Sequence, residues 1–270
     1  MDKQTKIWQS IEAELNLFNE LKLEDVVDYK KFYLYSIITH STAIEGSTLT
    51  EPETKLLFDD GITANGKPLV HHLMNEDLKN AYVFASLKAA EKSPVTTGFL
   101  QELNALVLKS TGSPTQVLGG AFDSSKGEFR LCGVTAGLGG ESYMNYLKVP
   151  TKVAELCEEL NKRLDVKELS AIYNLSFDAH LNLVTIHPWV DGNGRTSRLL
   201  MNYIQFYRQV FPVKIYHEDK ADYIAALIES RKKEDNSPFR EFMAQQLLKT
   251  LKEETTTYKQ SQNKAFSFLF

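Results

Sequence analysis

The sequence predicts a mainly α-helical protein with one short β-hairpin flap. Apolar residues recur at helical spacing through most of the 270 residues. The segment 112–150 lacks this spacing and holds eight of the 14 glycines, which marks it as the exception. The composition, 43% hydrophobic and 24% charged, is that of an ordinary globular protein. A chain of this length can bury a substantial core, in one large domain or in a domain with an added subdomain.

Helices are predicted first in the N-terminal half. Apolar side chains three or four residues apart occupy 8–18 and 32–42, and the same pattern predicts helices over 76–91, 97–108 and 152–164. From this pattern we expect an N-terminal helical region over 1–90, a core over 91–251 and a C-terminal tail over 252–270. The apolar end of that tail has no function that the sequence explains.

The glycine-rich segment contains two short stretches that predict strands, 128–131 and 134–136, around a turn at Cys132 and Gly133. A single hairpin cannot form a sheet core of its own. We therefore expect residues 127–137 to form a flap lying on the helical body, with a plain glycine-rich surface loop as the alternative.

The helical pattern returns in the second half. Ser170 is a predicted N-cap, and an apolar stripe follows it up to Ile186. Pro188 ends this helix because the residue before a proline is disfavoured in helical conformation. Helical spacing resumes at 195–207, and further helices are predicted at about 222–230 and 238–251.

The loop between these helices carries the residues best suited to chemistry. Gly192 and Gly194 permit positive φ and a close approach of an anion to the main chain. The loop amides and the N-terminus of the next helix form an anion-binding site. Arg195 and Arg198 lie three residues apart, on one side of that helix. Together these features predict a site for a polyphosphate.

Two further side chains suit a reaction at that polyphosphate. Mg²⁺ commonly binds one carboxylate together with phosphate oxygens, and Asp191 lies beside the anion loop. His187 stands at the end of the preceding helix, and histidine exchanges protons near neutral pH. We therefore expect Asp191 to bind the metal and His187 to act as a general base.

Residues 187–198, HPWVDGNGRTSR, resemble the Fic family signature HPFx(D/E)GNGRxxR, with Trp189 in place of the usual Phe. The resemblance extends over about 39–242 and implies a Fic-fold helical bundle. It implies a protein adenylyltransferase that moves AMP from ATP to a Ser, Thr or Tyr hydroxyl of a target protein, with Mg²⁺ at Asp191 and His187 as the base. Related Doc toxins have Lys at the position of Gly194 and act as kinases, so the glycine favours nucleotidyl transfer.

The resemblance also assigns binding residues. The target peptide is expected to pair with the flap. The implied ATP-binding residues are Asp191, Gly192, Asn193, Gly194, Arg195, Thr196, Ser197, Arg198 and Tyr223, and the implied flap residues are Arg130, Val134, Thr135 and Ala136.

A second motif lies upstream, where Ser41, Glu45 and Gly46 resemble the family's inhibitory motif (S/T)xxxE(G/N). Gly46 fits the residue after a helix end. The N-terminal position of this motif is that of class II Fic proteins. The resemblance implies that Glu45 pairs with Arg198, removes that arginine from the γ-phosphate and so inhibits the enzyme.

Other functions stay open. The same site could remove AMP from a modified protein, or the chain could be a nucleotide-responsive interaction module without enzyme activity. The net charge of −4 argues against nucleic-acid binding, and about twenty residues after Leu251 are too few for an added DNA-binding domain. ATP and a protein target, which could be the chain itself, are the expected partners, and a homodimer is left open.

Localisation follows from what the sequence lacks. No stretch approaches the roughly 20 apolar residues of a membrane helix, the first residues do not resemble a signal peptide, and Cys132 and Cys157 are expected to be reduced. A cytoplasmic location is therefore expected.

Overall fold

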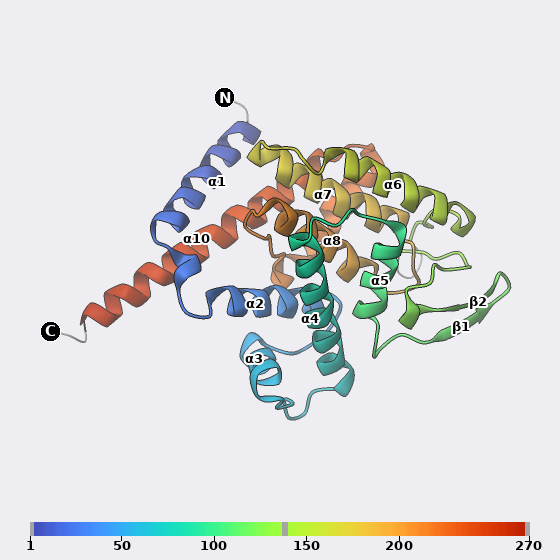
Figure 1. Ribbon diagram of the computed structural model, residues 1–270, viewed down its shortest axis with the longest axis horizontal. Helices are drawn as coiled ribbons and strands as arrows, with labels where there is room; N and C mark the ends of the chain where they lie inside the picture. Colours follow the sequence, from blue (N-terminus) through green and yellow to red (C-terminus); the bar gives the residue numbers. More distant parts are fainter. Residues whose placement is uncertain (1–2, 137–139, 268–270) are drawn as a thin grey trace. The chain divides into compact units, whose positions relative to one another are not determined.

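The computed structural model describes residues 3–136 and 140–267, which form ten α-helices, four short 3-10 helices and one two-stranded sheet (Figure 1). These elements confirm a mainly helical fold with a small hairpin. The described residues divide into two compact units: Ser41–Pro212, and the residues up to His40 together with those from Val213 onward.

The first of these units, Ser41–Pro212, contains the predicted motifs. Its helices are α3 (Glu51–Asp60), α4 (Leu69–Ala90), α5 (Thr97–Val107), α6 (Val149–Arg163), α7 (Leu169–Ile186) and α8 (Asn193–Arg208), with 3-10 turns η2 (Ser124–Lys126) and η3 (Tyr146–Lys148). Helix α8 packs against α4, α5 and α7, and α6 lies along α7 (Figure 1). The predicted apolar stripe of α7 is buried from Ile172 to Ile186, which places its helix in the core of this unit.

The second unit joins the two ends of the chain. It contains α1 (Lys3–Glu20), η1 (Leu23–Asp25), the start of α2 (Tyr29–Ile44), η4 (His217–Asp219), α9 (Lys220–Lys233) and α10 (Ser237–Ser267). Helix α10 packs against both α1 and α9. This division differs from the expected boundaries at residues 90 and 251, because the sequence does not show that the first and last helices pack together.

Helix α10 also corrects the expected helix end at residue 251. Leu251 and Thr255 are buried, and Thr255 donates to the Glu14 carboxylate of α1 at 3.4 Å. Packing against α1 therefore continues beyond the predicted end, and the backbone stays helical to Ser267. The apolar residues 268–270 of the expected tail lie outside the described residues.

The predicted strands at 128–131 and 134–136 are wrong. The sheet is formed by β1 (Pro114–Val117) and β2 (Gly120–Asp123), antiparallel, with Pro114 opposite Asp123. Figure 1 shows this hairpin extending away from α5. Leu118 and Gly119 form its two-residue turn, and Gly120 follows with a φ of 126°. Thr135 forms only an isolated bridge with Ser142, and Gly137, the expected end of the flap, is outside the described residues.

Two helix starts also differ from expectation. Glu168, not Ser170, caps α7, because its carboxylate accepts the Ser170 and Ala171 amides. Helix α3 was not predicted, although Thr50 and Glu53 form a capping box at its start. Within the described residues, no helix combines the length and the hydrophobicity needed to cross a membrane.

Candidate functional site

His187 terminates α7 in the left-handed conformation, with a φ of 52°. Its Nδ1 lies 3.3 Å from the Val184 carbonyl oxygen. Because a carbonyl only accepts, this contact assigns the ring proton to Nδ1 and leaves the Nε2 lone pair to accept a proton when the ring is neutral. The Tyr143 ring stacks on the imidazole with 3.8 Å between centroids, which fixes the plane of the ring.

The loop after His187 is held by Trp189 and Asn193. The Asn193 side chain donates to the Trp189 carbonyl at 2.9 Å and accepts the Trp189 amide at 3.1 Å. The indole is fully buried, and its Nε1 donates to the Gly127 carbonyl at 2.9 Å. The Asn193 side chain therefore ties the start of α8 to Trp189. The indole of Trp189 makes a hydrogen bond that the usual phenylalanine cannot make.

Arg130 braces this loop from the preceding segment. Its guanidinium is buried and donates to three carbonyl oxygens, those of His187, Cys132 and Met144, at 2.7–2.8 Å. Its backbone amide donates to the Pro188 carbonyl at 3.0 Å. Arg130 thus positions the backbone at His187 and Pro188, whereas the sequence predicted a flap side chain for a target peptide. The expectation and the structure differ because the Arg130 side chain is buried against three carbonyl oxygens and is not free to reach a peptide.

The other predicted flap residues lie on a short paired stretch beside His187. The Tyr143 amide donates to the Val134 carbonyl, and the Ala136 amide donates to the Glu141 carbonyl, with Thr135 bridged to Ser142. Tyr143, on the second side of this pairing, is the residue that stacks on His187. The structure therefore brings Val134, Thr135 and Ala136 close to the histidine, while binding of a target by them stays a prediction.

Asp191 and Gly192 form the turn before α8. Gly192 has a φ of 77°, and a Cβ there would lie 2.6 Å from the Asn104 amide nitrogen, so both the conformation and the space require glycine. The Gly192 amide donates to Asp191 Oδ1 at 2.6 Å. The Asp191 side chain is 65% exposed, with Arg195 Nη2 at 3.4 Å. An exposed carboxylate of this kind fits Mg²⁺, which keeps several waters when it binds protein.

The start of α8 supplies amide donors. The Thr196 amide bonds the Gly192 carbonyl at 2.9 Å, so the amides of Asn193, Gly194 and Arg195 precede the first intrahelical bond. Such amides at a helix N-terminus bind anions. The Thr196 and Ser197 side chains are fully buried, and a contact of these two residues with ATP stays a prediction.

Asn104 of α5 is a site residue that the sequence did not reveal. Its amide nitrogen donates to the Asp191 carbonyl at 3.3 Å and to Thr196 Oγ1 at 3.1 Å, so it joins both sides of the turn. The side chain is fully buried. The available signal was one amide within an otherwise apolar helix face, where a polar group needs a partner.

Arg198 is held by the upstream motif. Its Nε donates to Ser41 Oγ at 2.8 Å, and its Nη2 donates to the Ser41 carbonyl at 2.9 Å and to Glu45 Oε1 at 2.7 Å. The Arg198 side chain is 3% exposed and that of Glu45 is 33% exposed. The predicted juxtaposition of Ser41, Glu45 and Arg198 is therefore present in the structure.

Two glycines permit this ion pair. Gly46 has a φ of 102° and ends α2, since the Ser47 amide bonds the Thr42 carbonyl and the Gly46 amide bonds the Ala43 carbonyl. A Cβ at Gly194 would lie 2.5 Å from Glu45 Oε1. Gly194 therefore leaves the space that the Glu45 carboxylate occupies beside the start of α8.

His180 lies near this pair, in the buried part of α7. Burial lowers the pKa of His180 well below its usual value, and the positive charge of Arg198 lowers this pKa further. The imidazole is fully buried, so its neutral form is the one that the fold accommodates.

Tyr223, also predicted to contact ATP, lies on α9 in the second unit. It is buried, and its ring packs with Phe239 and Phe242 of α10 at centroid distances of 6.3 and 6.0 Å. These contacts are those of a core residue of the helix pair. A role for Tyr223 in nucleotide binding stays a prediction.

Residues 94–205 match the family model described as Fic/DOC family, and they form a domain of that family. The match includes the whole loop from His187 to Arg198.

Curated relatives carry the name protein adenylyltransferase Fic. The Drosophila melanogaster protein is 31% identical over 226 residues, which are 82% of this chain and 42% of the relative, and the Drosophila erecta protein is 30% identical over the same shares. The chain thus spans less than half the length of these relatives.

Solved structures share the fold. A Fic domain-containing signalling protein from Bacteroides thetaiotaomicron has a TM-score of 0.78 at 23% identity, covering 93% of this chain and 97% of the other. Fic-1 from C. elegans has a TM-score of 0.70 at 23% identity, covering 93% and 72%. The fold is therefore the helical Fic fold with a small hairpin.

Proposed function

We propose that this chain transfers AMP from ATP to a hydroxyl group of a protein and that Glu45 restrains this reaction. The observation that carries the proposal is the placement of His187, with Nδ1 on the Val184 carbonyl, directly before the braced anion loop of α8. The names of the Drosophila relatives support the same activity.

In the proposed reaction, the amides of Asn193, Gly194 and Arg195 bind ATP phosphates. Asp191 would hold Mg²⁺, which would neutralise phosphate charge. Nε2 of His187 takes the proton from the target hydroxyl, and the hydroxyl oxygen forms a bond to the α-phosphorus. The bond between that phosphorus and the bridging oxygen breaks, and pyrophosphate leaves. The protein contributes alignment, charge stabilisation and proton removal.

The proposed restraint acts through Arg198. A charge-assisted hydrogen bond to Glu45 keeps the guanidinium from a terminal phosphate, and the carboxylate stands beside the amides of α8, where it repels an anion. ATP bound in this state would be poorly aligned for transfer. The resting chain would then be a slow enzyme.

The test compares Glu45→Gly with the native chain in self-labelling by ATP radioactive at the α-phosphate. We expect label transfer to rise by about tenfold or more, since one charge-assisted hydrogen bond is worth ~1.5–3 kcal/mol. Glu91→Gly is the matched control, because Glu91 also caps a helix C-terminus, is exposed and pairs with Lys88. Its labelling should equal that of the native chain.

His187→Ala in the Glu45→Gly background separates the two parts of the proposal. Label transfer should disappear while nucleotide binding persists. Transfer that survives without His187 would overturn its role as the base, and equal labelling of Glu45→Gly and native protein would overturn the restraint. Loss of AMP from a pre-modified target with native protein, but not with Glu45→Gly, would instead identify the reverse reaction.

A further inference from the structure

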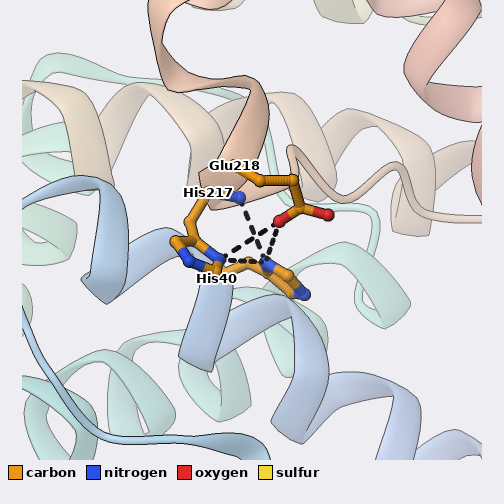
Figure 2. Close-up of side chains that lie close together, drawn as sticks. All are labelled: His40, His217 and Glu218. Atoms are coloured by element: carbon orange, nitrogen blue, oxygen red, sulfur yellow. Dashed lines mark hydrogen bonds and ion pairs between the residues drawn. The ribbon is translucent and has the colours of Figure 1, made fainter.

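Three side chains with metal-binding atoms meet in the second unit, and none of them belongs to the loop 187–195. His40 lies on α2, and His217 and Glu218 begin η4, 177 residues later in the chain (Figure 2). Figure 2 shows the two imidazoles and the carboxylate pointing toward one another. One atom from each residue, two imidazole nitrogens and one carboxylate oxygen, lies within 4.8 Å of the others.

The separations match those of ligands around one small ion. Nδ1 of His40 and Nδ1 of His217 are 3.3 Å apart, and Glu218 Oε2 is 3.2 Å from the second and 3.8 Å from the first. Zinc–nitrogen bonds of about 2.0–2.1 Å place neighbouring ligands of a tetrahedron about 3.3 Å apart. The three atoms are therefore close to the corners of one face of a tetrahedral site.

The protonation of His40 suits a ligand. The His217 backbone amide donates to Nδ1 of His40 at 3.1 Å, so this nitrogen presents a lone pair and the ring proton belongs on Nε2. An ion between the rings would take over this lone pair from the amide. It would also replace the contact between the two Nδ1 atoms, 3.3 Å apart, with a bond from each nitrogen to the ion.

The surrounding residues hold the carboxylate and balance the positive charge of Lys249. Lys249 Nζ lies 3.4 Å from Glu218 Oε1, the oxygen that is not directed at the histidines, and 2.8 Å from Asp219 Oδ2. Gln246 also donates to Asp219 at 2.8 Å. Lys249 thus has a second carboxylate partner in Asp219. Its contact with Oε1 orients the Glu218 carboxylate and leaves Oε2 as the oxygen that can bind a metal.

Access to the cluster is open on one side. The His40 side chain is 12% exposed, whereas those of His217 and Glu218 are 57% and 49% exposed. The Tyr216 ring contacts the His40 ring edge-on, 5.1 Å between centroids, and limits its rotation. One ligand is therefore fixed by packing, and two can adjust around an ion that enters from solvent.

We propose that His40, His217 and Glu218 bind a Zn²⁺ ion, with a fourth position left to water. Two imidazoles and one carboxylate suit zinc and related transition ions, whereas Mg²⁺ and Ca²⁺ prefer oxygen ligands. This site is distinct in composition from Asp191, where a single carboxylate suits Mg²⁺. It does not depend on the proposed AMP transfer.

The test measures zinc bound to the full chain by equilibrium dialysis and mass spectrometry, in the Asp191→Ala background so that the loop carboxylate does not contribute. We expect one Zn²⁺ per chain. His217→Ala and Glu218→Gln should each weaken binding by more than about 100-fold, beyond the 10–100-fold typical of residues that only support a ligand. His71→Ala and Glu229→Gln are matched controls, being a histidine and a glutamate outside the cluster.

A spectroscopic measurement identifies the ligands. Co²⁺ should give the strong visible absorption of a tetrahedral site in the parent protein, and His217→Ala should lose it. Added Zn²⁺ should raise the thermal midpoint of the parent and of both controls, but not of the His217 variant. Absence of stoichiometric zinc, or equal zinc affinity in the parent and the His217 and Glu218 variants, would overturn the proposal.

Discussion

Trp189 shows how much one side chain contributes to the loop between α7 and α8. We expect Trp189→Phe to lower the free energy of unfolding by ~1–3 kcal/mol, because the Gly127 carbonyl loses its indole donor in a buried place. Urea unfolding measures this loss. The other tryptophan gives the control: Trp8→Phe, in the partly exposed α1, should cost less. Equal effects of the two substitutions would contradict the role given to the indole hydrogen bond.

The sequence was informative about the site where its residues are neighbours in the chain. The loop motif indicated His187, Asp191 and the glycines, because these residue types at this spacing predict an anion-binding loop beside a proton acceptor and a metal ligand. Asn104 was not identified, and Arg130 was assigned to the flap and not to the support of the loop, since their partners lie 87 and 57 residues away and their roles depend on burial. The link between Glu45 and Arg198 came from resemblance to a family motif, as no local pattern joins two residues 153 positions apart.

At the scale of elements, the end of α2 determines where Glu45 stands. Gly46 adopts a φ of 102°, a conformation that costs other residues ~1–2 kcal/mol. We expect Gly46→Ala to fray the last turn of α2, even though no atom lies within 4 Å of an added Cβ. In this variant, hydrogen exchange of the backbone amides of residues 46 and 47, measured by mass spectrometry, should be faster than in the native chain.

A second glycine provides the comparison for that experiment. Gly61 ends α3 with a φ of 67° and likewise has open space around a built Cβ. Gly61→Ala should therefore accelerate exchange at the end of α3 and leave the end of α2 unchanged. If Gly46→Ala leaves the α2 amides protected, the left-handed turn is not what holds Glu45 in place.

Prediction succeeded for long amphipathic helices and failed for short elements. The stripes of α4 and α7 repeat over several turns, so their apolar faces were visible in the sequence. The strands were misplaced because Pro114–Val117 is a partly exposed hairpin arm without an apolar alternation, whereas residues 128–136 contain the apolar residues that a strand would need. In the structure, Arg130 of this segment bonds His187 and Pro188 of the loop before α8, and the segment forms no strand.

At the scale of the whole molecule, buried His180 makes stability depend on pH. Its pKa is lowered in the folded chain relative to the usual value near 6.5, so below that pH the unfolded chain binds a proton that the folded chain does not. Stability from this group is therefore lost as the pH falls through the unfolded value, with a slope of up to about 1.4 kcal/mol per pH unit.

Urea unfolding between pH 5 and 8 tests this dependence by comparing the native chain with His180→Gln. The variant should show the smaller loss of stability toward acid pH, whatever its stability at pH 8. Identical slopes in the two proteins would show that His180 is not the group responsible. The other histidines are the same in both proteins and cancel from the comparison.

The pairing of the two chain ends lay beyond sequence reasoning for a physical reason. Periodicity reports which face of a helix is apolar but not which distant helix covers it. Helices α1 and α10 each show such a face, and only the structure joins them into one unit.

Arg198 has acceptors of two kinds, and the difference has a quantitative consequence. If Glu45 swings away, the guanidinium still has both oxygens of Ser41, so its position survives the loss of the Glu45 contact. A competing ligand then has at least the charge-assisted hydrogen bond from Arg198 Nη2 to Glu45 to displace, worth ~1.5–3 kcal/mol, which is equivalent to a reduction in apparent affinity of roughly tenfold or more. The fraction of chains in which Arg198 is released from Glu45 therefore rises gradually with ligand concentration, and no helix has to unfold.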